Sequence, residues 1–219
     1  MKYLNNRSYD LVVFDWDGTL LDSTAAIVRA IQAASRDVGA EVPTDERARY
    51  VIGMGLREAL MHAVPDLPES RYNDLVEAYR KHYLSGDNEL TLFAGVEPLL
   101  QTLQAEHRWI AVATGKSRLG LDRALGHSGL GRYFDTTRTA DETRGKPHPQ
   151  MLQEIIDQFA VDPERTLMIG DTTHDLLMAQ NAGAKGLGIT HGAHAVEDLL
   201  ACNPVGLVNS IPDLANWMK

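Results

Sequence analysis

The chain has 219 residues, of which 44% are hydrophobic, and its formal net charge at pH 7 is −9. The length suits one large domain or a domain with an insertion, and the hydrophobic content supports a sizeable core and excludes a disordered chain. The acidic balance argues against binding to nucleic acid or to an anionic membrane, because both need basic surface. Cys202 is the only cysteine, so an internal disulfide and a cluster of thiolate metal ligands are excluded.

The segment from Met1 to Tyr9 is polar and lacks the apolar run of a signal peptide. No apolar run approaches the ~20 residues that a membrane-spanning helix needs. We therefore expect a cytoplasmic protein without a membrane or nucleic-acid partner. A small anionic substrate remains compatible with the net charge, because a single local cation can dominate a pocket.

The first predicted strand, Leu11 to Phe14, has the length and composition of a buried parallel strand. Asp15 and Asp17 follow it, and then Gly18, which lets the backbone turn sharply. In open α/β sheets, ligands bind beyond the carboxyl ends of the strands. Two acids at that place repel each other unless a cation or a proton lies between them. The alternative interpretation is that both acids only form a turn.

The alternation of strands and helices is then interrupted by a helical segment. Helices are expected from Ala25 to Val38, from Thr44 onward and from Leu67 to Leu84. We interpret residues 23–89 as a helical domain inserted into an α/β core that comprises residues 1–22 and 90–219. An insertion beside strand ends usually shapes a site, although it could also serve stability alone.

Within this insertion, the segment from Gly53 to Leu60 combines two glycines with Arg57. Glycines allow a mobile turn that approaches another group closely. We therefore expect a loop that carries Arg57 toward a ligand. The alternative is a helix break with a solvated Arg57.

The next predicted strand, Trp109 to Ala113, ends in Thr114 and Gly115. A hydroxyl, a glycine amide and a helix N-terminus at the end of a strand can bind one phosphate group. The alternative is an ordinary capped turn, and the segment lacks the longer glycine pattern of a P-loop. A weak strand is expected from Tyr133 to Thr137.

Lys146 lies between Gly145 and Pro147, and a proline disfavours helical backbone at the residue before it. We therefore expect Lys146 in an extended loop, before a helix that Pro149 opens. A lysine held in such a loop among carboxylates is a strong partner for phosphate. His148 has no paired acid or nucleophile, so we favour a loop role for it over a catalytic one.

A second acidic segment follows the predicted strand from Thr166 to Ile169. Asp171 lies at the end of this strand and Asp175 four residues later, so a helix that begins between them would let both carboxylates face one point. With Asp15 and Asp17, the chain offers four carboxylates at two strand ends. Oxygen ligands with open coordination positions suit Mg²⁺.

The remaining segments alternate between strand and helix and complete the sheet. Strands are expected from Lys185 to Thr190 and from Val205 to Val208. Helices are expected from Val196 to Ala201 and from Pro212 onward.

The ordered motifs resemble those of the haloacid dehalogenase superfamily of phosphohydrolases over the whole chain. The similarity is greatest to the branch with a helical cap after the first motif, which includes phosphoglycolate phosphatase-like enzymes. Each motif is short, but the ordered set is specific. The resemblance implies a Rossmann-like core, a doubly wound parallel sheet, with an inserted α-helical cap. The matching segments are Asp15 to Thr19, Thr114 with Gly115, Lys146, and Gly170 to Asp175.

The resemblance also implies the roles of the acids. Asp15 is expected to attack phosphorus and form an aspartyl-phosphate, and Asp17 to protonate the leaving alcohol and then activate water. The carboxylates of Asp15 and Asp171 would bind Mg²⁺ together with the backbone carbonyl of Asp17, with Asp175 nearby. Relatives that act on carbon–halogen or carbon–phosphorus bonds generally lack the second carboxylate, so Asp17 favours phosphate esters.

The phosphoryl group would be held by Thr114, the Gly115 amide and Lys146, and Gly18 is also expected to bind it. We further expect Arg57 to contact the non-reacting end of the substrate when the cap closes.

We therefore expect a Mg²⁺-dependent phosphatase that hydrolyses a small phosphomonoester. Phosphoglycolate is the leading candidate, because the segment from Gly53 to Leu60 resembles the cap loop of phosphoglycolate phosphatases and related pyrophosphatases. The alternatives are a phosphosugar mutase similar to β-phosphoglucomutase, a pyrophosphatase, and a non-catalytic phosphate-binding protein. A monomer or a homodimer acting on a small phosphorylated metabolite is expected.

Overall fold

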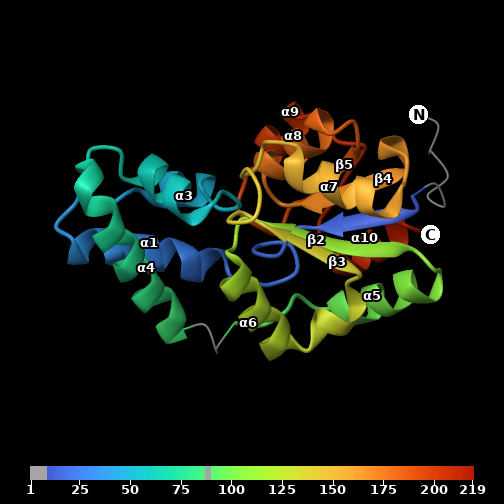
Figure 1. The fold of residues 1–219 in the computed structure, drawn as a ribbon, viewed down its shortest axis with the longest axis horizontal. Coiled ribbons are helices and arrows are strands. Elements are labelled where there is room, and N and C mark those ends of the chain that lie inside the picture. Colours follow the sequence, from blue (N-terminus) through green and yellow to red (C-terminus); the bar gives the residue numbers. More distant parts are fainter. Residues whose placement is uncertain (1–8, 87–89) are drawn as a thin grey trace.

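The computed structural model describes residues 9–86 and 90–219. Parallel strands form one sheet with helices on both faces (Figure 1), which confirms the doubly wound α/β fold. The order of its six strands is β3-β2-β1-β4-β5-β6. They are β1 (Leu11–Phe14), β2 (Trp109–Thr114), β3 (Thr136–Thr139), β4 (Thr166–Gly170), β5 (Lys185–Ile189) and β6 (Gly206–Val208).

The central strand β1 is buried on both faces, as its unbroken apolar run predicts. Its side chains alternate between two hydrophobic cores, because successive residues of a strand point to opposite faces. Val12 and Phe14 belong to one core, and Leu11 and Val13 belong to the other. The helices that cover the sheet are α5 (Val96–Ala105), α6 (Arg118–Ser128), α7 (Gln150–Phe159), α8 (Thr173–Asn181), α9 (Val196–Ala201) and α10 (Ile211–Trp217).

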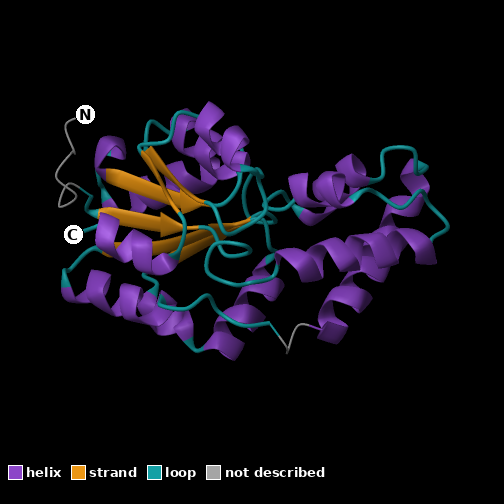
Figure 2. Cartoon of the chain, turned by 180° about the vertical axis from the view of Figure 1, so that it is seen from behind, coloured by secondary structure: helices purple, strands orange, loops and turns teal. Residues whose placement is uncertain are grey.

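A second group of helices lies beside the sheet and forms the inserted cap (Figures 1 and 2). These helices pack around a hydrophobic core of their own, in which Ile31, Leu60 and Leu75 are buried. They are α1 (Thr24–Asp37), α2 (Asp45–Tyr50), α3 (Leu56–Ala63), the 3₁₀ turn η2 (Glu69–Arg71) and α4 (Tyr72–Gly86). The predicted boundary at residue 89 lies outside the described residues. None of the helices in the described part of the chain is long and apolar enough to span a membrane.

Two local predictions are wrong. The loop expected from Gly53 to Leu60 ends at Gly55, where α3 begins, so Arg57 lies in the first turn of a helix. The physical reason is packing, since Ala59 and Leu60 are buried in the cap core. The strand expected from Tyr133 to Thr137 begins later, at Thr136, because the preceding residues form a 3₁₀ turn, η4 (Leu130–Tyr133).

Candidate active site

The carboxyl ends of the neighbouring strands β1 and β4 bring three aspartates together. The cap helices lie beside this end of the sheet (Figure 1). Carboxylate oxygens of Asp15, Asp171 and Asp175 lie within 4.8 Å of one another, and all three residues are buried. The predicted geometry around β4 is confirmed, because α8 begins at Thr173, between Asp171 and Asp175. Asp175 is fixed by a capping box at the start of this helix, in which the Thr172 hydroxyl lies 2.6 Å from its carboxylate.

Lys146 lies between two of these aspartates. Its Nζ is 2.7 Å from Asp15 Oδ1 and 2.5 Å from Asp175 Oδ1, and its side chain is fully buried. Burial by itself lowers the pKa of Lys146, but the charges of Asp15 and Asp175 more than offset this and raise it above its usual value. The ammonium group therefore stays protonated and balances part of the negative charge of the site.

Asp171 is enclosed by groups from two segments, residues 18–19 and residues 192–193. It accepts hydrogen bonds from the Thr19 hydroxyl at 2.8 Å and from the Ala193 amide at 2.7 Å. A side chain at Gly18, whose φ is +78°, or at Gly192 would collide with the Asp171 carboxylate. Gly18 is therefore required both for its turn and for this close approach. The sequence does not predict that residues 192–193 contact the Asp171 carboxylate, since no sequence motif marks them.

The cluster has the properties of a site for a hard cation. Within the described part of the chain, Asp15 Oδ2 is buried without a hydrogen-bond partner. Burial and then the charge of Asp175 raise the pKa of Asp171 to about 7, and burial raises that of Asp15 well above its usual value. Burial and mutual repulsion therefore disfavour the charged forms of both carboxylates. The three aspartates can hold a divalent cation through oxygen, and such a cation would remove the repulsion.

The second predicted acid, Asp17, lies beside this cluster and has its own partners. Its Oδ1 accepts a hydrogen bond from Ser23 Oγ at 2.7 Å, and its Oδ2 lies 3.0 Å from Lys116 Nζ. Ser23 precedes α1 but makes no capping hydrogen bond with its side chain and instead orients Asp17. Lys116 Nζ also donates to Tyr83 Oη of α4 at 3.1 Å, so it joins the core to the cap. Neither Lys116 nor Tyr83 was predicted; the only signal is that Lys116 directly follows Gly115.

The predicted phosphate-binding residues lie at the end of β2. Thr114 is buried, and its hydroxyl accepts a hydrogen bond from the Lys116 amide at 3.2 Å. The following helix, α6, begins after Ser117, whose hydroxyl caps it. A side chain at Gly115 would collide with the carbonyl groups of Gly53 and Met54, so the cap touches the core at this point.

The cap meets the core again at two histidines. The Nε2 atoms of His174 and His194 lie 2.8 Å and 3.0 Å from the carbonyl oxygen of Tyr50 at the end of α2. Burial lowers the pKa of both imidazoles, which is consistent with neutral rings. The Tyr50 ring stacks on His194 with centroids 5.5 Å apart. These contacts hold the cap against the strand ends in this structure.

Arg57 lies in the wall of the cavity between cap and core. Its guanidinium donates to Asn73 Oδ1 at 2.9 Å and pairs with Glu69 at 3.4 Å, and its side chain is 47% exposed. Its contact with a substrate stays a prediction, as does the metal contact of the Asp17 carbonyl.

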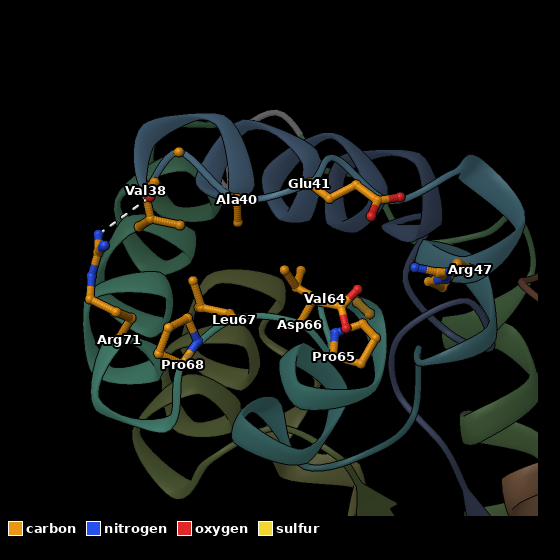
Figure 3. A pocket seen from close by; sticks show the side chains of 12 residues that line it. Val38, Ala40, Glu41, Arg47, Val64, Pro65, Asp66, Leu67, Pro68 and Arg71 are labelled. Carbon is orange, nitrogen blue, oxygen red and sulfur yellow. Dashed lines mark hydrogen bonds between the residues drawn. The ribbon is translucent and has the colours of Figure 1, made fainter.

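Two cavities adjoin the cap. The larger has a volume of about 550 Å³, lies between cap and core, and is lined by Asp15, Asp17, Thr114 and Gly115 among others. The smaller, of about 250 Å³, lies within the cap, with Arg71 bonded to the Val38 carbonyl at its edge (Figure 3). None of the predicted site residues lines the smaller cavity, so the larger one is the cavity of the candidate site.

Comparisons with known proteins agree with these motifs. The chain is 35% identical over 211 residues to a probable phosphatase, IndB, of Dickeya dadantii, covering 93% of this chain and 91% of the relative. It is 28% identical over 220 residues to a phosphoglycolate phosphatase of Vibrio parahaemolyticus, covering 96% of each. A crystal structure of a predicted phosphoglycolate phosphatase from Haemophilus somnus matches with a TM-score of 0.86 at 23% identity, covering 97% of this chain and 99% of the other. The family model of haloacid dehalogenase-like hydrolases matches residues 12–189, and the chain belongs to that family.

Proposed function

We propose that the protein is a Mg²⁺-dependent phosphatase that hydrolyses a small phosphomonoester through an aspartyl-phosphate on Asp15. One observation carries this proposal: Asp15 lies in a buried cluster with Lys146, Asp171 and Asp175, while Asp17 lines the same cavity with separate partners. Two carboxylates in different surroundings can serve as nucleophile and as acid–base group.

The residues divide the reaction between them. A carboxylate oxygen of Asp15 would form a bond to phosphorus while the ester oxygen leaves and takes a proton from Asp17. Asp17 would then take a proton from the water that attacks the aspartyl-phosphate, releasing phosphate and restoring Asp15. The second acid is needed because the first one is covalently occupied.

Charge neutralisation is the second requirement, because an anionic carboxylate must approach an anionic phosphate. Lys146 is placed to offset this repulsion, and Thr114 and the Gly115 amide would orient the phosphoryl oxygens. Asp15, Asp171, Asp175 and the Asp17 carbonyl would hold Mg²⁺, which when bound supplies further stabilisation of charge on the transferring group.

The relatives support the phosphatase class and leave several substrates open. Phosphoglycolate is a candidate because the Vibrio relative carries that name. Pyrophosphate, sugar phosphates and nucleoside monophosphates are the other candidates from the sequence. We also propose that Arg57 contacts the non-reacting end of the substrate; its present ion pair with Glu69 is exposed and therefore costs little to exchange.

A panel of phosphate esters, pyrophosphate and sugar phosphates, assayed with Mg²⁺ and the purified protein, tests the proposal. Release of inorganic phosphate from monoesters supports it. Isomerisation of a sugar phosphate without net release would instead indicate a mutase. Failure to process any compound would indicate a phosphate-binding protein without activity.

A further inference from the structure

The cavity between cap and core is acidic at the end that holds Asp15 and Asp17 and largely apolar elsewhere. The apolar part of its surface comes from three cap helices and α6. These wall residues include Ile27 and Ile31 of α1, Leu56 and Leu60 of α3, Tyr79 of α4 and Leu119 of α6. Charged side chains also belong to the lining: Arg57, Glu58, Arg80, Lys116, Arg123 and Asp141.

The size of this cavity exceeds what a two-carbon leaving group needs. Its volume of about 550 Å³ falls within the range of roughly 300–1,000 Å³ that is typical of sites for considerably larger ligands. A glycolate group would leave most of the apolar wall uncovered, and uncovered apolar surface contributes nothing to binding.

Leu119, a residue that lines the cavity, is a second and independent indication that the cavity binds an apolar group. Leu119 is 81% exposed, the most exposed of the large hydrophobic side chains in the described part of the chain, and it lies on the core side of the cavity. On the cap side, Tyr79 also lines the cavity and stacks with Tyr83 at a centroid distance of 5.7 Å. An apolar part of a substrate that extends from the phosphate site into the cavity could contact both Leu119 and Tyr79.

We propose that the cavity binds the leaving group and selects phosphomonoesters whose alcohol carries an apolar body several carbons larger than glycolate. The inference rests on the proposed function and narrows it, because it disfavours phosphoglycolate as the preferred substrate. Specificity would come from apolar area covered in the walls, while the acidic end performs the same chemistry on every ester.

Three esters test this inference: ethyl phosphate, 3-phenylpropyl phosphate and phosphoglycolate, each assayed with Mg²⁺ for kcat/KM. Ethanol and 3-phenylpropanol are simple primary alcohols, so the chemical step is alike and the ratio of kcat/KM measures binding in the cavity. We expect kcat/KM for 3-phenylpropyl phosphate to be at least about tenfold higher than for ethyl phosphate, since each buried methylene raises the binding constant several-fold. It should also be higher than kcat/KM for phosphoglycolate.

A matched pair of leucines provides the control. Leu119→Ser should lower the ratio between 3-phenylpropyl and ethyl phosphate by about threefold or more, because it removes apolar wall. Leu200→Ser should leave the ratio unchanged, because Leu200 is a 55% exposed leucine of α9 that does not line the cavity.

Equal kcat/KM for the two alkyl esters, or a preference for phosphoglycolate over both, would overturn the inference and leave the phosphatase proposal intact. Equal effects of Leu119→Ser and Leu200→Ser on the ratio of kcat/KM between 3-phenylpropyl and ethyl phosphate would also overturn the inference. If no phosphate is released from any ester, p-nitrophenyl phosphate included, the phosphatase proposal itself fails, and the inference fails with it.

Discussion

At the scale of single residues, Lys146 has two tasks that the structure makes inseparable. In the proposed mechanism it offsets the charge of the phosphoryl group, and in the structure it compensates the buried carboxylates of Asp15 and Asp175. A buried ion pair is not by itself a source of stability, but removing one partner leaves an uncompensated charge. Lys146 is therefore expected to matter for folding as well as for catalysis.

Lys146→Met should abolish activity and lower the free energy of unfolding of the metal-free protein by about 3–5 kcal/mol, the range for breaking a buried ion pair. Urea unfolding at pH 8 measures this. The control is Lys185→Met, which removes a lysine paired with exposed Glu164 and should cost only about 0–1 kcal/mol. Equal destabilisation by both changes would show that Lys146 does not compensate buried charge.

Asp171 makes stability depend on pH and metal together. Its pKa, raised to about 7, lies above the ordinary value of 3.8, so between these values the folded protein holds a proton that the unfolded chain has lost. The stability of the metal-free protein should therefore fall as pH rises from about 4 through 7, and a bound cation should offset this loss.

Added Mg²⁺ should accordingly raise the melting temperature more at pH 8 than at pH 6, as differential scanning calorimetry with EDTA-treated protein can show. Asp171→Asn should remove most of the metal-induced shift. A shift of the same size at both pH values, or none at pH 8, would count against the carboxylate site.

At the scale of elements, the central strands could be predicted because their own residues determine them. β1, β2 and β4 are continuous apolar runs, and the structure places them within one residue of the predicted bounds. α3 could not be predicted in the same way, because its two preceding glycines suggested a loop and only packing of Leu60 in the cap core reveals the helix.

The site was predictable to a similar degree. Asp15, Lys146, Asp171 and Asp175 lie in short motifs, and the structure brings them together. The link from Lys116 to Tyr83 joins residues 33 positions apart on different parts of the molecule. No local pattern encodes such a contact, so it required the fold.

The turn after β2 provides a test at the element scale. Gly115→Ala should reduce kcat/KM by at least about tenfold, because the added methyl group collides with two carbonyl groups of the cap and displaces it from the site. Gly126→Ala is the matched control, since Gly126 of α6 has open space around it and alanine favours helix. Comparable activity of the two variants would mean that this contact does not position the cap.

At the scale of the whole molecule, our proposals assign chemistry and recognition to different parts of the chain. Figure 1 shows the cap helices beside the strand ends of the sheet. The cavity between cap and core is lined by Asp15 and Asp17 of the core and by apolar side chains that come mostly from the cap. Contacts through Tyr50, Gly53 and Tyr83 seat the cap over the acids. In the proposed mechanism, this position of the cap would exclude bulk water while the aspartyl-phosphate forms, and opening of the cap would release the alcohol.

The most direct test is to capture phosphate on Asp15. Purified protein with Mg²⁺ and ³²P-labelled substrate is quenched in acid on the millisecond scale, and the labelled peptide is identified. We predict that the label resides on Asp15, and that nearly isosteric Asp15→Asn is folded but shows neither label nor turnover. Substantial turnover by Asp15→Asn, or label on another residue, would contradict a covalent mechanism at this aspartate.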